Sequence, residues 1–133
     1  MQLVVDTNIL ISALVARAIT FDTILLGNLE LSTPEHTLEE IERNREDLQK
    51  RMKISQSEFS VVLNILLSHV TVIPREQYIH TEEKAKTISP HYKDFPFFAL
   101  ALAKGLPIWS NELRLKNQEI VKVYNIKEVL DFV

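Results

Sequence analysis

The stretch V-V-D-T-N-I-L, residues 4–10, decides the fold. It closes a short apolar run, residues 2–5, which predicts a buried strand. The polar group that follows, Asp6, Thr7 and Asn8, is typical of a helix N-terminus, and apolar residues continue to residue 16. We therefore predict a strand that passes directly into a helix beginning near Ile9, with a carboxylate at the junction.

The rest of the chain repeats this alternation of short apolar runs and helical patterns. Further strands are predicted at residues 29–32, 70–73, 107–110 and 120–124. Helices are predicted at residues 21–26, 77–88, 97–103 and 126–132, with a short one after Glu112. A further helix is predicted to run from Pro34, in its first turn, to about Lys50, and another from a Ser55–Glu58 capping box to about His69. This order predicts a three-layer α/β/α sandwich with a mainly parallel sheet of about five strands.

The composition narrows the class of protein. The chain has 133 residues, 46% of them hydrophobic, and we expect residues 1–133 to form a single domain with a real core. Without cysteine it can form neither disulfides nor thiolate metal sites, and its two glycines exclude a glycine-rich phosphate loop. A net charge of −3 argues against a basic surface throughout, but it allows a local basic patch.

Nothing in the sequence points to a membrane or to export. No apolar run reaches the ~20 residues that span a bilayer. The first apolar segment is interrupted by D-T-N, and it lacks the basic region and cleavage site of a signal peptide. Together with the absence of cysteine, these features lead us to expect a cytoplasmic protein.

Acidic residues follow the predicted strands. Asp6 closes the first strand, Glu112 lies two residues past the fourth, and Asp94 opens the buried helix that leads into the fourth. Glu40 lies on the helix after the second strand. Because ligands of open α/β sheets bind beyond the carboxyl ends of the strands, these four carboxylates are expected at one edge of the sheet.

Such crowding of carboxylates favours a divalent cation. Two charges about 5 Å apart repel by about 3 kcal/mol at an effective dielectric constant near 20. Either the pKa values rise or a cation binds, and hard oxygen ligands favour Mg²⁺ or Mn²⁺. A metal in this setting activates water and stabilises charge on a phosphate, so the pattern predicts hydrolysis of a phosphodiester without a nucleophilic side chain.

Four segments of the chain resemble the PIN-domain family, in the same order. V-V-D-T-N-I-L (4–10) is similar to the opening strand, catalytic Asp and helix; T-P-E-H-T-L-E-E-I (33–41) is similar to the segment of the second acid. K-D-F-P-F-F-A-L-A-L-A (93–103) resembles the third-acid segment and L-P-I-W-S-N-E (106–112) the fourth, which is usually W-[ST]-x-D. In this chain Glu112 stands where the family normally has Asp, so its carboxylate reaches one methylene further.

The resemblance implies a metal-dependent endoribonuclease that hydrolyses RNA by metal-activated water, with one or two Mg²⁺ or Mn²⁺ ions held by Asp6, Glu40, Asp94 and Glu112. It also implies that polar neighbours orient the carboxylates or water: Thr7, Asn8, Ser110 and Asn111. Many family members are toxins of the VapC type held by an antitoxin protein, and many are homodimers. Both an antitoxin and a second copy are therefore candidate partners, besides the RNA substrate.

Each acid also has a simpler interpretation. Asp6 and Asp94 could serve only as helix N-caps, and Glu112 as an ordinary acid in a first helical turn. Glu40 could form a capping box with Thr37. On a helical wheel Glu40 lies about 110° from the centre of the apolar stripe and Glu39 about 150°, so Glu40 is nearer the flank, with Glu42 on the opposite flank as the runner-up.

The basic, histidine and apolar residues leave further alternatives open. One basic cluster could guide RNA electrostatically or form a solvated helix face: Arg43, Arg45, Lys50, Arg51 and Lys53. The four histidines show no ligand spacing and are interpreted as surface or packing residues: His36, His69, His80 and His91. Trp109 is expected in the core. The apolar face at residues 59–67 is mostly core, and its excess could contact a second copy or a partner's helix.

Two rival functions remain at this point. A non-catalytic module would keep the fold but only bind RNA or protein, and it would lack millimolar affinity for Mn²⁺. Aspartyl-nucleophile phosphatases also begin with an Asp after the first strand, but they need a second Asp two residues later. Asn8 occupies that position, which argues against a phosphatase of this class.

Overall fold

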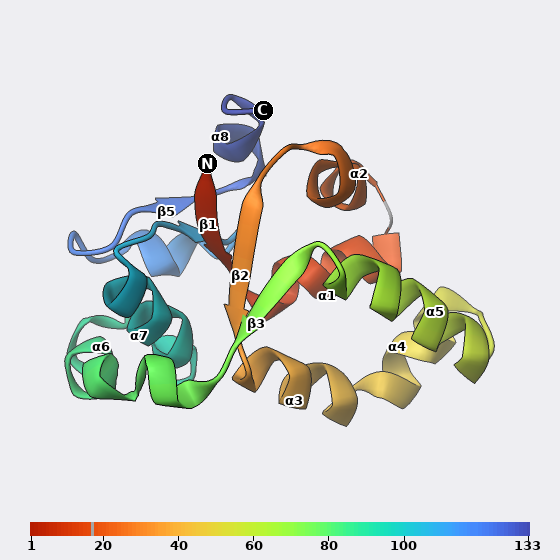
Figure 1. Ribbon diagram of the computed structural model, residues 1–133, viewed down its shortest axis with the longest axis horizontal. Helices are drawn as coiled ribbons and strands as arrows, with labels where there is room; N and C mark the ends of the chain where they lie inside the picture. The colour runs from red at the N-terminus through yellow and green to blue at the C-terminus, as the bar shows by residue number, and fades with distance from the viewer. Residues whose placement is uncertain (17) are drawn as a thin grey trace.

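A five-stranded, wholly parallel sheet forms the centre of the molecule (Figure 1). The computed structural model describes residues 1–16 and 18–133. The strand order is β3-β2-β1-β4-β5. The strands are β1 (Gln2–Val5), β2 (Glu30–Pro34), β3 (Val70–Ile73), β4 (Ile108–Trp109) and β5 (Val123–Tyr124). The chain therefore builds one half of the sheet outward from β1, returns, and builds the other half from β4.

Helices cover both faces of the sheet, which confirms the three-layer prediction. Along β1, Leu3 and Val5 belong to one apolar cluster while Val4 belongs to the other. Successive side chains of a strand point to opposite faces, so β1 is buried on both sides. Figure 1 shows the two helical layers on either side of the strands. The helices are α1 (Thr7–Ala16), α2 (Ile19–Leu26), α3 (His36–Arg43), α4 (Arg45–Met52), α5 (Gln56–Leu67), α6 (Glu82–Ile88), α7 (Phe95–Lys104) and α8 (Ile126–Leu130).

Two predicted elements around residue 34 are wrong. Pro34 ends β2 instead of opening a helix, and the charged helix is divided at Asn44 into α3 and α4. The Glu35 amide donates to the Ile73 carbonyl of β3, so the nitrogen of Pro34 faces the β1 side, beyond the last β1–β2 pair (Val4 with Ser32). Proline is tolerated there because no ladder hydrogen bond is lost.

Other bounds differ from prediction by smaller amounts. The helix after β1 begins at Thr7, two residues before Ile9, and β5 is confined to Val123–Tyr124. The predicted polar helix at 77–88 is two short 3₁₀ turns, Arg75–Gln77 and Ile79–Thr81, followed by α6. The segment after Glu112 is a 3₁₀ turn, η4 (Leu113–Lys116).

Across residues 1–16 and 18–133, no single helix is long and apolar enough to cross a membrane. Helices α1 and α2 reach the required length only when they are taken together, and they lie at 112° to each other.

The capping box of α5 gives a test of the fold at the level of one hydrogen-bonded pair. The Glu58 amide donates to Ser55 Oγ, and the Ser55 amide donates to Glu58 Oε1, each at 3.1 Å. Ser55→Ala removes the first of these bonds, so we expect the free energy of unfolding to fall by about 1 kcal/mol. Urea denaturation measures it; the neighbouring exposed Ser57→Ala is the control and should change stability by much less. Equal effects of the two variants would contradict the capping role.

Candidate active site

The four acids predicted from the sequence lie at the edge of the sheet where β1 adjoins β4. Asp6 follows β1, and its amide donates to the carbonyl of Trp109, the last residue of β4. Glu112 follows β4, Asp94 precedes α7, and Glu40 lies in the second turn of α3. Strand order reverses between β1 and β4, which is where doubly wound sheets bind ligands.

Asp6 is a buried carboxyl group at the centre of this edge. Its side chain is shielded so well that the residue is only 5% exposed, and burial raises its pKa to about 6. Hydrogen bonds from the Ser110 hydroxyl and the Ile9 amide (2.8 Å) oppose this rise, while the charges of Asp94 and Glu112 add to it. Asp6 therefore caps α1, as the simpler interpretation of this residue predicted. The charges of Asp94 and Glu112 also act on its carboxyl group.

Asp94 does not act as a simple cap. It occupies the N-cap position of α7, but its side chain makes no capping hydrogen bond. Burial raises the pKa of Asp94; His91 and Arg114 lower it, and Glu112 and Glu40 raise it. Its Oδ2 is 3.9 Å from His91 Nδ1. The capping alternative is therefore wrong for the Asp94 side chain, which faces a hollow beside α3.

Glu40 is held by two polar side chains. Thr7 Oγ1 donates to its Oε1 at 2.7 Å, and His36 Nε2 lies 3.1 Å from the same oxygen. Burial acts to raise the pKa of Glu40, but the hydrogen bonds from His36 and Thr7 outweigh it and leave the pKa lowered. The predicted alternative of a Thr37–Glu40 capping box is wrong, because α3 has no side-chain cap and Thr37 bonds elsewhere.

A chain of three buried threonine hydroxyls connects Glu40 to the sheet. Thr33 donates to the Val5 carbonyl at 2.9 Å, Thr33 and Thr37 lie 2.7 Å apart, and Thr37 and Thr7 lie 3.0 Å apart. A carbonyl and a carboxylate only accept, so Thr33 and Thr7 use their protons at the two ends and Thr37 donates to one neighbour. This chain ties α3, α1 and β2 together behind the Glu40 carboxylate.

Glu112 is the most exposed of the four acids. Its side chain is 40% exposed, and its Oε1 lies 3.2 Å from Arg114 Nε. It precedes the 3₁₀ turn η4 but makes no capping bond with its side chain. Its backbone amide donates to Ser110 Oγ at 3.0 Å, so one serine contacts both the Asp6 carboxyl and the segment that carries Glu112.

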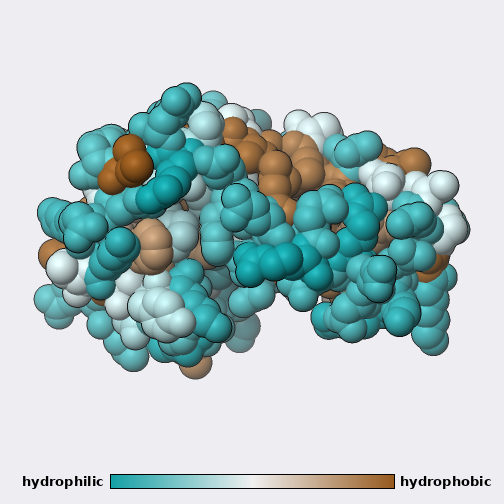
Figure 2. All heavy atoms as spheres, turned by 90° about the horizontal axis from the view of Figure 1, so that it is seen from below, coloured by the Kyte–Doolittle hydropathy of each residue, from teal (hydrophilic) through white to brown (hydrophobic). Residues whose placement is uncertain are grey.

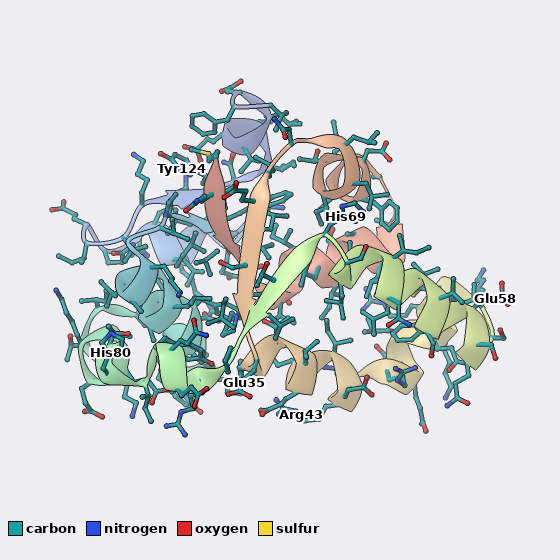
Figure 3. The ribbon with its side chains drawn as sticks, viewed as in Figure 1. Glu35, Arg43, Glu58, His69, His80 and Tyr124 are labelled. Atoms are coloured by element: carbon teal, nitrogen blue, oxygen red, sulfur yellow. The ribbon has the colours of Figure 1, made fainter. Side chains whose placement is uncertain are left out.

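A hollow of about 490 Å³ opens beside these acids. Glu40 and Asp94 line it together with three basic side chains, Arg43, Lys93 and Arg114, while Asp6 lies outside the lining. Figure 3 shows Arg43 and Glu35 at the lower edge of the molecule, toward which β2 points. The surface seen from that side is mostly hydrophilic (Figure 2). A hollow with both signs of charge is suited to a phosphate chain with a cation.

The donor atoms of this edge fit Mg²⁺ or Mn²⁺ in kind, because all four acids offer hard carboxylate oxygens. Among residues 1–16 and 18–133, however, no group of three or more His, Asp or Glu side chains is placed to hold a metal ion. Glu40 is turned to His36 and Thr7, and Glu112 to Arg114. The charges of Asp94 and Glu112 raise the pKa of Asp6, and those of Glu112 and Glu40 raise the pKa of Asp94, so the four carboxylates lie close enough to affect one another.

Comparison with known proteins is consistent with this arrangement. A family model described as "PIN domain" matches residues 4–123. The chain belongs to the PIN-domain family. The fold is also that of a chain in the crystal structure of VapBC2 from Rickettsia felis bound to a DNA fragment from their promoter: the TM-score is 0.66 at 18% identity, over 94% of this chain and 98% of that one. No curated protein sequence matches the chain.

The polar neighbours predicted beside the acids of this PIN domain divide into two groups. Thr7 bonds Glu40, and Ser110 bonds Asp6. Asn111 instead accepts a hydrogen bond from the Ile126 amide at 2.9 Å, so its side chain fixes the start of α8. Asn8 is exposed.

The basic cluster is likewise divided. Arg43 lines the hollow, whereas Arg45 pairs with Glu42 and lies over the ring of Phe59. Arg51 lies 3.9 Å from Asp47, and Lys50 and Lys53 are exposed on or just after α4. None of these four residues lines the hollow, although all five remain candidates for RNA contact.

Sequence reasoning missed several residues of the site. His36 and His91 pack against the rings of Phe97 and Tyr92, as interpreted, but the sequence did not predict that His36 bonds Glu40 and that His91 lies near Asp94. His36 is four residues before Glu40 on one helix, and this spacing was a usable signal. Trp109 is fully buried, as predicted. Tyr92 lies two residues before Asp94 and Arg114 two residues after Glu112, but only long-range packing brings these two segments to the same hollow beside α3.

Replacement of Asp6 should change how stability depends on pH. The pKa of Asp6 is about 6 in the fold and 3.8 ordinarily, so the folded state binds the proton more tightly than the unfolded state does. The stability that protonation of Asp6 adds is fully present below pH 3.8 and is lost as the pH rises through about 6. In EDTA at pH 8 we expect Asp6→Asn to be more stable than the wild type by up to about 3 kcal/mol, and the difference to shrink toward pH 4. Urea denaturation across this range measures it; a difference independent of pH would contradict the assignment.

The threonine chain gives a second stability test. Thr37→Val preserves shape but removes the middle hydroxyl, so we expect the free energy of unfolding to fall by about 1–2 kcal/mol. Thr20→Val is the matched control, because Thr20 is buried but lies outside this chain of bonds. Thermal or urea denaturation compares the two variants. An equal loss of unfolding free energy in both would show that the hydrogen bonds between the three threonines add no stability of their own.

Proposed function

We propose that this PIN domain is a metal-dependent endoribonuclease that hydrolyses RNA phosphodiester bonds. The observation that carries the proposal is the Asp6 carboxyl, buried at the β1–β4 edge and coupled to the charges of Asp94 and Glu112. Burying an ion without a counter-charge costs several kcal/mol, and family membership supports a divalent cation as that counter-charge. Asp6 and Asp94, with Glu40 and Glu112, would hold Mg²⁺ or Mn²⁺.

The chain's own residues would position the reaction. A bound divalent cation would supply activation of water and stabilisation of the charge that develops on the phosphate. Ser110 and the Ile9 amide fix the Asp6 carboxyl, and Thr7 fixes that of Glu40. Arg43, Lys93 and Arg114 line the hollow from different segments and would attract the phosphates of the substrate. The site would need no covalent intermediate.

We further propose that an antitoxin protein or a second copy contacts the chain. The similar crystal structure is described as a VapBC2 complex bound to promoter DNA, which supports a toxin–antitoxin role here. The apolar face of α5 is mostly core: Phe59, Leu63 and Leu66 are buried, but Val61 and Ile65 are 58% and 46% exposed. These exposed side chains are candidates for such a contact.

One observation favours a second candidate, a binding module with little or no catalysis. Glu112, in place of the family's usual Asp, pairs with Arg114, and within the described ranges the acids are not gathered into a group able to hold a metal. Mn²⁺ titration by calorimetry separates the two: millimolar or tighter affinity that is lost in Asp94→Asn supports the nuclease, and no binding supports the module.

Cleavage of RNA by purified protein tests the nuclease directly. We expect Mn²⁺-dependent cleavage of a labelled RNA by the wild type, and a loss of at least about 100-fold in Asp6→Asn and Asp94→Asn, because each removes a charge that would hold the cation. Asp131→Asn changes an exposed acid at the end of α8 and should cleave normally. Cleavage by Asp6→Asn at the wild-type rate would refute the proposal.

A further inference from the structure

An aromatic pair stands at the rim of the hollow, and the proposed hydrolysis does not use it. The rings of His91 and Tyr92 are stacked, with centroids 5.5 Å apart and planes 24° from parallel. Both residues line the hollow. Tyr92 is 70% exposed, so with one ring face against His91 most of its remaining surface is open to solvent. An aromatic ring fixed on one face and open on the other is the shape of a stacking platform.

The turn that carries this pair is held in place. The His91 carbonyl accepts hydrogen bonds from the Ser89 hydroxyl and the Asp94 amide, and Tyr92–Asp94 forms a 3₁₀ turn (η3) that leads into α7. His91 Nδ1 is buried without a hydrogen-bond partner in the described part of the chain, and it lies 3.9 Å from Asp94 Oδ2. The platform and the Asp94 carboxylate are therefore parts of one short, ordered segment.

Three basic side chains line the same hollow as the aromatic pair. Lys93 follows Tyr92 directly, Arg43 comes from α3, and Arg114, which pairs with Glu112, comes from the turn η4. Lys93 has no ion pair within residues 1–16 and 18–133. Cations from separate segments beside an open aromatic face match a nucleotide, whose phosphate is negative and whose base has a flat π surface.

We propose that Tyr92, supported by His91, stacks an unpaired base of single-stranded RNA and so delivers the adjoining phosphate toward Asp94. This inference rests on the proposed nuclease function for the identity of its ligand. A duplex is a poor ligand for the platform because its bases are already stacked on one another. Selection at this point is for an unstacked base and is tolerant of its sequence.

A comparison of two RNA probes isolates the stacking from the charge. One probe is a fluorescein-labelled eight-nucleotide single strand; the other has the same length and phosphates but lacks the four central bases. Anisotropy titrations in EDTA, where metal-dependent cleavage is absent, use the wild type, Tyr92→Phe, Tyr92→Ala and Phe132→Ala. Phe132 is the matched control because it is a 48% exposed aromatic residue that does not line the hollow.

We expect the wild type, Tyr92→Phe and Phe132→Ala to bind the complete strand on the order of tenfold more tightly than the abasic strand. Tyr92→Ala should bind both strands with the affinity that the wild type shows for the abasic one. Equal binding of both strands by the wild type, unchanged preference in Tyr92→Ala, or equally tight binding of an eight-base-pair RNA duplex would each overturn the inference.

Failure of the proposed function would be visible separately. If Asp6→Asn cleaves RNA like the wild type in Mn²⁺ but Tyr92→Ala loses the preference for bases, the nuclease assignment fails and the stacking platform stands. If cleavage depends on Asp6 but Tyr92→Ala keeps the preference, the platform alone is rejected.

Discussion

The structure depends on one constraint: a carboxyl group is buried where the central strand ends. Asp6 is fixed by its backbone bond to Trp109 of β4 and by side-chain bonds to the Ile9 amide and Ser110. These neutral donors do not offset the loss of water, since the pKa of Asp6 remains raised to about 6. At neutral pH the charge of Asp6 therefore opposes folding unless a cation accompanies it, and the proposed function would require the same charge that lowers the stability of the fold.

The other three acids differ in the partners that the fold gives to their carboxylates. Glu40 and Glu112 each have a cationic or polar partner within the chain, His36 and Thr7 for the first and Arg114 for the second. Asp94 has only more distant positive charges, and its pKa is raised by burial. The two groups with raised pKa values are thus the ones that a divalent cation would stabilise most, whereas Glu40 and Glu112 would have to exchange existing partners to bind it.

The alternation of strands and helices could be predicted because the strands contain short apolar runs, and the central strand β1 is buried on both faces, as Leu3, Val4 and Val5 show. The placement of Asp6 and Asp94 followed from the same alternation, since acids at the ends of parallel elements meet at one edge. Pro34 was misassigned because its tolerance depends on where the neighbouring strand β1 ends, which no local pattern reveals. His91, Tyr92 and Arg114 lie within three residues of Asp94 or Glu112, but the hollow that they line with α3 forms only when these segments fold together.

The polar groups of the candidate site lie at two depths, with hydroxyls buried behind Glu40 and exposed side chains in the hollow. Buried hydroxyls, Thr33, Thr37 and Thr7, run from the Val5 carbonyl to Glu40 and can hold a carboxylate in one orientation. The exposed ring of Tyr92 and the side chain of Lys93 line the hollow, where the proposed RNA substrate would make contact. RNA, the proposed substrate, is charged along its whole length, and a protein with a net charge of −3 would attract it less as a whole than a strongly basic protein would. The proposed binding of RNA would therefore depend on local positive charge, which Arg43, Lys93 and Arg114 supply in the hollow beside Glu40 and Asp94.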